Sequence, residues 1–165
     1  MVITTDYNSA NMINSLNSEM NLNYLNLVDD MIDVCKNFLT DVREQLQDHS
    51  QGTYLDQTTQ LRNSLAAYIY RNGSLLWADE GENGEESRKI ISDQIHFTPH
   101  GFDIIGIASK EYASWVESKG YNVITNQGEW FFVNLGEVFS KLGYKEIGSL
   151  KITSPIRAIT TVKYD

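Results

Sequence analysis

The sequence is poor in the residues from which disulfides, cysteine-rich metal sites and membrane spans are built. It contains one cysteine, Cys35, so neither an internal disulfide nor a cysteine-rich zinc site can form. No apolar run approaches the roughly 20 residues that a membrane-spanning helix needs. The first residues also lack the basic start and the apolar stretch of a signal peptide. We therefore expect a soluble protein that is made and used in a cytoplasm, with no membrane partner.

Basic residues are scarce as well. Lys and Arg number 13 against 22 Asp and Glu, which gives a net charge of -9. A chain with so few cations is poorly suited to holding nucleic acid through its phosphates. The charge is compatible with a protein that surrounds DNA without gripping it, because an acidic surface repels the phosphate backbone. Ordinary solubility explains the same charge, so charge alone does not separate the two.

Patterns typical of catalytic and metal sites are also missing. His96 and His100 are four residues apart, but Pro99 lies between them and disfavours a shared helix face. The candidate serines, such as Ser109, lack the flanking glycines of a nucleophile elbow. The carboxylates of residues 79–87 do not follow the ligand spacing of a calcium loop. We therefore expect no enzyme, no metal and no cofactor.

The length and apolar content indicate one folded domain that spans residues 1–165. With 165 residues and a hydrophobic fraction of 41%, the chain can bury a core without staples. Residues 1–20 are rich in Asn and Ser, and we expect a flexible arm or an arm that orders against a partner.

Between residues 21 and 48, apolar residues recur every three or four positions, which predicts a long amphipathic helix. The stripe consists of Leu25, Val28, Ile32, Cys35, Leu39, Val42 and Leu46, and Met31 and Phe38 widen it. Two interpretations remain open. Either the stripe covers the sheet of its own domain, or part of it packs against a neighbouring subunit. The candidate assembly positions in the stripe are Leu25, Ile32 and Leu39.

A β-hairpin is predicted at residues 64–78. Apolar and aromatic residues flank Asn72-Gly73, a pair preferred in two-residue hairpin turns because both positions accept a positive φ. An acidic segment follows at residues 79–88, where we expect a mobile loop of the kind that orders on assembly. Its carboxylates are further candidate assembly residues: Asp79, Glu80, Glu82, Glu85 and Glu86. A short helix or edge segment is expected at residues 88–95.

Residues 102–124 predict a strand, a short helix and a second strand. The isoleucine-rich residues 102–108 form the first strand, Ser109 caps the helix, and Gly120 ends it. Residues 121–124 are expected to leave as an extended segment. The apolar face of the helix consists of Tyr112, Trp115 and Val116.

The last third predicts a second helix at residues 128–142 and one or two strands within residues 150–164. Pro155 requires a bend, a bulge or an edge position between the two halves of that closing run. The predicted fold is therefore α+β. A long N-terminal amphipathic helix and a second helix pack on a small, mainly antiparallel sheet that contains the hairpin.

Two segments carry a resemblance to a known family. The segment TQLRNSL, residues 59–65, leads into the hairpin, and GIASKEYASWVE, residues 106–117, is followed by Gly120. Together they resemble the head–tail connector and tail-completion proteins of tailed bacteriophages, which are neck or minor capsid proteins. The resemblance covers about residues 55–124, with the long N-terminal helix in its expected place. The motif positions are Leu61, Arg62, Ser64, Tyr112, Glu117 and Gly120.

The resemblance implies a structural subunit of the virion that sits at the neck–tail junction and is assembled in the cytoplasm of the host bacterium. Copies would form a closed ring that joins the portal or adaptor protein to tail and neck proteins. Double-stranded DNA would pass through the lumen without specific binding. Because a ring interface is heterologous, each subunit needs two different surfaces. The arm, the acidic segment and the C-terminal strands are the candidates.

Within the second motif, Tyr112 is expected to pack its helix on the sheet. Glu117 either accepts a hydrogen bond or faces solvent, and both readings remain open. The alternative function is a small cytoplasmic adaptor or protein-binding domain without enzymatic activity.

Overall fold

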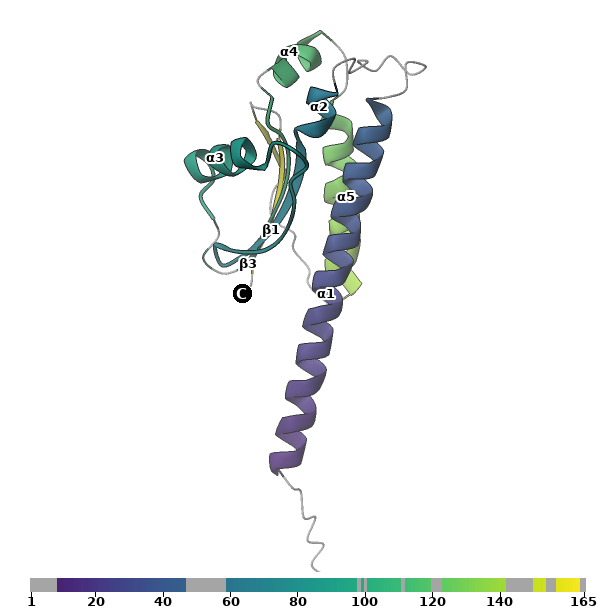
Figure 1. Ribbon diagram of the computed structural model, residues 1–165. Helices are drawn as coiled ribbons and strands as arrows, with labels where there is room; N and C mark the ends of the chain where they lie inside the picture. The colour runs from purple at the N-terminus through teal and green to yellow at the C-terminus, as the bar shows by residue number, and fades with distance from the viewer. Residues whose placement is uncertain are drawn as a thin grey trace, which may run out of the picture.

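The computed structural model describes residues 9–46, 59–97, 99, 101–110, 112–119, 123–141, 150–153 and 157–163 (Figure 1). The fold is α+β, with a long N-terminal helix and further helices packed on an antiparallel sheet. The helices are α1 (Ser9–Gln45), α2 (Gln60–Asn63), α3 (Gly84–Gln94), α4 (Tyr112–Ser118) and α5 (Thr125–Lys141).

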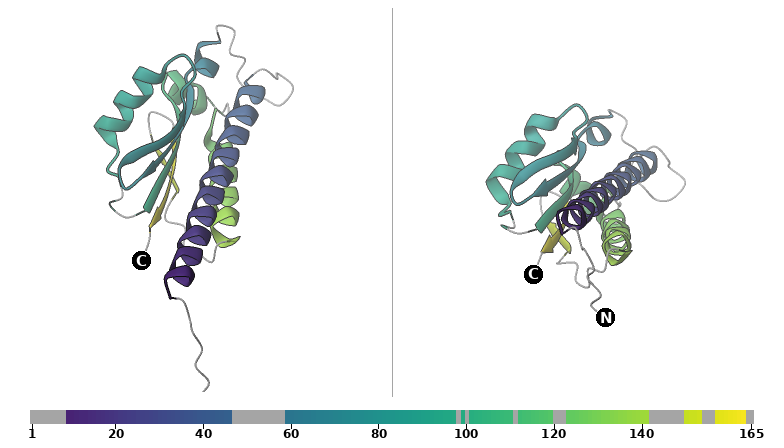
Figure 2. Two further views of the ribbon diagram at one scale, coloured as in Figure 1. Left: turned by 60° about the horizontal axis from the view of Figure 1, so that its bottom comes forward. Right: turned by 90° about the horizontal axis from the view of Figure 1, so that it is seen from below.

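The sheet has the strand order β2-β1-β3-β5-β4, and every neighbouring pair is antiparallel. Its strands are β1 (Leu65–Arg71), β2 (Ser74–Asp79), β3 (Gly101–Ala108), β4 (Leu150–Thr153) and β5 (Arg157–Lys163). Helices α1 and α5 lie on one face of the sheet and α3 lies on the other, so the domain has three layers (Figures 1 and 2). The prediction of one or two strands in the closing run is confirmed, since β4 and β5 both lie there, while Pro155 lies outside the described residues.

The hairpin prediction is confirmed. Strands β1 and β2 pair antiparallel around Asn72-Gly73, whose φ angles are 51° and 79°, and the register shifts once, at Leu76. Two successive positive φ angles give a turn whose twist matches that of the flanking strands. The Asn72 side chain also accepts a hydrogen bond from the backbone N–H of Gly101, at 2.9 Å, which fixes the turn to the start of β3.

Alternation along the strands divides the core into two layers. In β1, Leu65, Ala67 and Ile69 belong to the layer under α1 and α5, whereas Ala66, Tyr68 and Tyr70 belong to the layer under α3. Strand β3 lies between β1 and β5, and all eight of its residues are buried. This burial on both faces explains why its sequence is a nearly continuous apolar run and does not alternate.

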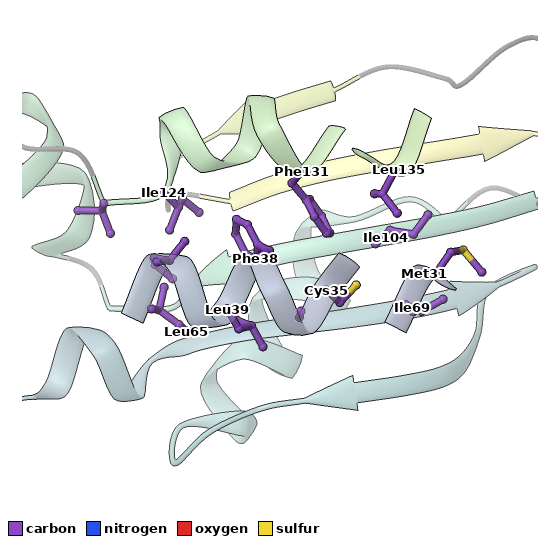
Figure 3. Packing of buried hydrophobic residues seen from close by; sticks show 14 of the residues in the cluster. Met31, Cys35, Phe38, Leu39, Leu65, Ile69, Ile104, Ile124, Phe131 and Leu135 are labelled. Atoms are coloured by element: carbon purple, nitrogen blue, oxygen red, sulfur yellow. The ribbon is translucent and has the colours of Figure 1, made fainter. Parts of the chain in front are cut away.

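Phe38 marks the place where α1, α5 and β3 meet. Its ring centre lies 4.7 Å from that of Phe131 on α5 (Figure 3). On the sheet side, the ring lies over Gly106, where an added Cβ would be 2.7 Å from Phe38 Cε1. A glycine inside a strand often permits such a close approach, and here the aromatic ring occupies the space of the missing side chain.

Helix α1 is longer than predicted and is buried on a shifted face. It begins at Ser9, so residues 9–20, for which a flexible arm or an arm that orders against a partner was predicted, are helical, and residues 1–8 lie outside the described part. Among the residues of the predicted stripe, Leu39 is 1% exposed, Ile32 is half-buried and Leu25 is 57% exposed. The stripe assigned from spacing therefore runs from the core at its C-terminal end to solvent at its N-terminal end.

Two predictions around α4 are wrong. Ser109 does not begin a helix, because its hydroxyl is directed to the carbonyl of Ser64 and α4 starts at Tyr112. Trp115 is exposed, so the apolar face of α4 that contacts the core is made by Ala113 and Val116. Val123 and Ile124 are buried but form a bend before α5, so the predicted second strand is absent from these two residues.

Candidate assembly surfaces

The two segments that carry the family resemblance meet in space. Strands β1 and β3 pair Leu65 with Ala108, which brings Ser64 beside Ser109 although they are 45 residues apart in sequence. The Ser64 carbonyl accepts hydrogen bonds from the backbone N–H and from the hydroxyl of Ser109, at 3.2 and 3.3 Å. The Ser64 hydroxyl itself donates to the carbonyl of Leu61 at 2.7 Å. Both serines are buried, so this junction has a structural role.

The remaining motif positions divide between core and surface. Leu61 is buried in the core under α1, and Arg62 is half-buried. Tyr112 and Glu117 lie in α4, but their side chains are outside the described part of the structure, as is Gly120. The expectations for these three residues therefore remain predictions.

The acidic segment is held to the domain by polar contacts. The prediction of a loop over residues 79–88 is wrong for its two ends, because Asp79 ends β2 and α3 begins at Gly84. Four of its carboxylates have side-chain partners, three of them outside the segment. Asp79 pairs with Arg43, Glu80 with Arg88, Glu82 with the Asn63 amide and Glu86 with Lys110.

These contacts join the acidic segment to several elements. The Glu86–Lys110 pair, at 3.0 Å, links α3 to the end of β3, and the Arg43 guanidinium also donates to the carbonyl of Leu65 at 3.3 Å. Glu85, in the first turn of α3, suits the positive end of the helix dipole. The acidic residues therefore stabilise the domain around the start of β1. Carboxylates that are already paired in this way are less suited to contact a neighbouring subunit.

A buried polar group lies beneath this segment. Burial, with the nearby Glu80 carboxylate as the next cause, raises the pKa of the Tyr68 phenol. Ser87 is fully buried at the same place. The arrangement contains no nucleophile with a base, and the described residues hold no group of three His, Cys, Asp or Glu side chains that could bind a metal ion. We assign it a packing role.

The largest exposed apolar side chains lie elsewhere. Met20, Leu22 and Leu25 project from the N-terminal half of α1, and Leu75 and Leu76 project from β2, which is an edge strand of the sheet. Leu75 is opposite Tyr70 and Trp77 is opposite Ile69, so Leu76 between them has no partner on β1, and the two leucines lie at an irregular part of this edge. Trp115 on α4 and Val133 on α5 are exposed singly.

Sequence reasoning missed most of these surfaces. Leu25 was identified, but Met20 fell in the predicted arm and Leu22 lay in the predicted helix outside its stripe. Leu75 and Leu76 were assigned to the hairpin without a surface role. The spacing of Leu22 and Leu25, three residues apart outside the buried stripe, was a usable signal. The edge position of β2 depends on strand order, which the sequence does not display.

Other predicted features give no site. His96 is exposed and His100 lies outside the described residues. Burial raises the pKa of the Cys35 thiol, which suits a packing role for this side chain. Of the helices that the structure describes, none combines the length and apolarity needed to cross a membrane.

No known protein family, curated protein or solved structure matches the chain.

Proposed function

We propose that the protein is a non-enzymatic structural subunit that forms a closed ring in the neck of a tailed bacteriophage. The ring joins the portal or adaptor protein to the tail and lines the channel for double-stranded DNA. The observation that carries the proposal is the placement of exposed apolar side chains on two unlike surfaces of one domain, the N-terminal half of α1 and the β2 edge.

Two unlike apolar surfaces are what a ring subunit requires. In a ring, each copy meets one neighbour through one surface and the other neighbour through a different surface, so the contact is heterologous. Leu75 and Leu76 flank an unpaired strand edge, a site that binds another chain readily. Met20, Leu22 and Leu25 lie on a helix, which has a different shape. A dimer with one self-complementary patch would need only one of the two.

The family resemblance gives the proposal its place in the virion. Its two motif segments are joined in the fold by the Ser64–Ser109 contacts, so the resemblance rests on one structural unit and not on two unrelated fragments. The segment in between contains the hairpin and α3, and so belongs to the same unit.

The charge distribution supports passage of DNA without binding. The solvent side of α1 carries Asp29, Asp30 and Asp33, all exposed and within five residues of each other. An acidic surface of this kind facing a channel repels the phosphate backbone. Since the carboxylates of residues 79–86 are mostly paired, we assign the repulsive role to α1.

The experiment that tests the proposal measures the mass and symmetry of the purified full-length chain, alone and mixed with portal particles. We expect closed rings with a single copy number, seen as one narrow mass and as rotational symmetry in class-averaged images. A chain that remains monomeric in both conditions contradicts the proposal and favours the adaptor alternative.

A further inference from the structure

The N-terminal end of α1 extends beyond the rest of the domain (Figure 1). We refer to residues 9–23 as the overhang. Among the side chains that the structure describes, contact with the body begins at Tyr24, whose ring stacks on Phe102 at a centroid distance of 6.5 Å and lies under the Arg71 guanidinium at 4.5 Å. The side chains described in the overhang, at residues 17–23, are all exposed. At 1.5 Å per residue, the overhang is about 22 Å long.

The composition of the overhang is unfavourable for an isolated helix. Its 15 residues include five Asn and three Ser, which are weak helix formers because their side chains compete for backbone hydrogen bonds. A helical segment of this length is marginal in water even with better residues, and most helices are stabilised by packing of an apolar face. The helical form of the overhang therefore calls for a surface to pack against.

Apolar residues lie on two sides of the overhang and its base. Met20, which is 68% exposed, lies on the side that continues the buried face of α1 through Tyr24. Leu22 and Leu25 share the other side, because residues three apart are neighbours on a helix. At about 100° per residue, Met20 and Leu22 point roughly 200° apart. Between these two sides runs a polar stripe that includes the exposed Asn17 and Asn21, which are four residues apart.

The charge of the overhang favours a second copy of the same chain as the partner. Two chains that each carry a net charge of -9 repel one another over most of their surface. The overhang contains a single charged residue, Glu19, and is therefore the part of α1 on which two copies can approach with least repulsion.

We propose that the overhangs of neighbouring copies lie side by side and parallel, with the Met20 side of one copy against the Leu22–Leu25 side of the next. Each overhang then buries both apolar sides, one against each neighbour, and leaves the polar stripe in solvent. The contact is heterologous and repeats around the ring. This inference rests on the proposed ring. It divides the exposed surface of α1 between the two neighbours and leaves the β2 edge for a second contact in the assembly.

Cysteine cross-linking tests the contact in the full-length chain. In the Met20→Cys/Leu22→Cys variant, the two thiols of one chain point in nearly opposite directions and cannot bridge each other. They can bridge between neighbours, so mild oxidation is expected to give a ladder of covalent dimers, trimers and higher species. The single variants Met20→Cys and Leu22→Cys should give no ladder. Cys35 is buried and serves as an unreactive internal control, and thermal unfolding of each reduced variant should match that of the parent chain.

The outcomes separate this inference from the proposed function. Rings of normal mass without a ladder in the double variant would overturn the side-by-side contact and leave the ring standing. Efficient dimers from Met20→Cys alone would also overturn it, because a residue facing its own counterpart means a self-complementary pair. A ladder in a chain that never closes into a ring would support the contact and contradict the proposed function.

Discussion

The two halves of α1 are one continuous helix in two different environments. From Leu27 to Leu46, the face directed at the sheet is buried, with Phe38 wedged between Gly106 and Phe131. From residue 9 to 23, the same helix extends past the body with no described contact to it. Spacing of apolar residues is similar in both halves. The difference shows that periodicity identifies a helix with an apolar face but not the partner of that face.

The largest expected difference comes from placing the same charged residue in each half of α1. Leu39→Asp places a carboxylate in the core, where neither water nor a cation can stabilise its charge. The variant should fail to fold and should show no cooperative thermal transition. Leu25→Asp, on the exposed flank, should change the free energy of unfolding by less than about 0.5 kcal/mol. Circular dichroism during thermal denaturation measures both.

The Leu25→Asp variant also has an assembly readout, because it should weaken ring formation while the monomer stays folded. A Leu39→Asp chain that is folded and fails only in assembly would show that the buried half is an interface. That result would reverse the assignment of the two halves.

A smaller effect tests how closely the buried half fits the sheet. Gly106→Ala would place a Cβ 2.7 Å from the Phe38 ring, so either the ring or the strand must shift. Overpacking of this kind typically costs about 1–3 kcal/mol. In the Phe38→Leu background, the same Gly106→Ala substitution should cost less, because the ring that it meets is gone. Equal costs in the two backgrounds, measured by urea denaturation, would mean that Phe38 does not occupy this space in solution.

Features with local causes were predictable from the sequence. Asn72-Gly73 specifies the hairpin by its own backbone preferences, and the isoleucine run of β3 indicates a strand buried on both faces. The pairing of helices and strands into an α+β fold followed from these elements. The two motif segments, although distant in sequence, meet where β1 begins and β3 ends.

Features that depend on the surroundings of an element were not predictable in the same way. Nothing in residues 9–26 marks where the body of the domain stops. The spacing of apolar residues therefore did not distinguish the exposed Leu25 from the buried Leu39. The acidic segment was assigned to a loop because of its glycines and charge, yet Glu85 and Glu86 are favoured in the first turn of α3. Ser109 has the chemistry of a helix cap, but its hydroxyl donates to the carbonyl of Ser64, the residue directly before β1.

Amide hydrogen exchange along α1 tests the central claim most directly, namely that one half of the helix belongs to the domain and the other to the assembly. In the assembled protein, amides from both halves should be protected. In dissociated monomers, residues 27–46 should remain protected, whereas residues 9–23 should exchange rapidly because the overhang has lost its packing surface. Equal protection of residues 9–23 in monomer and assembly would contradict the account.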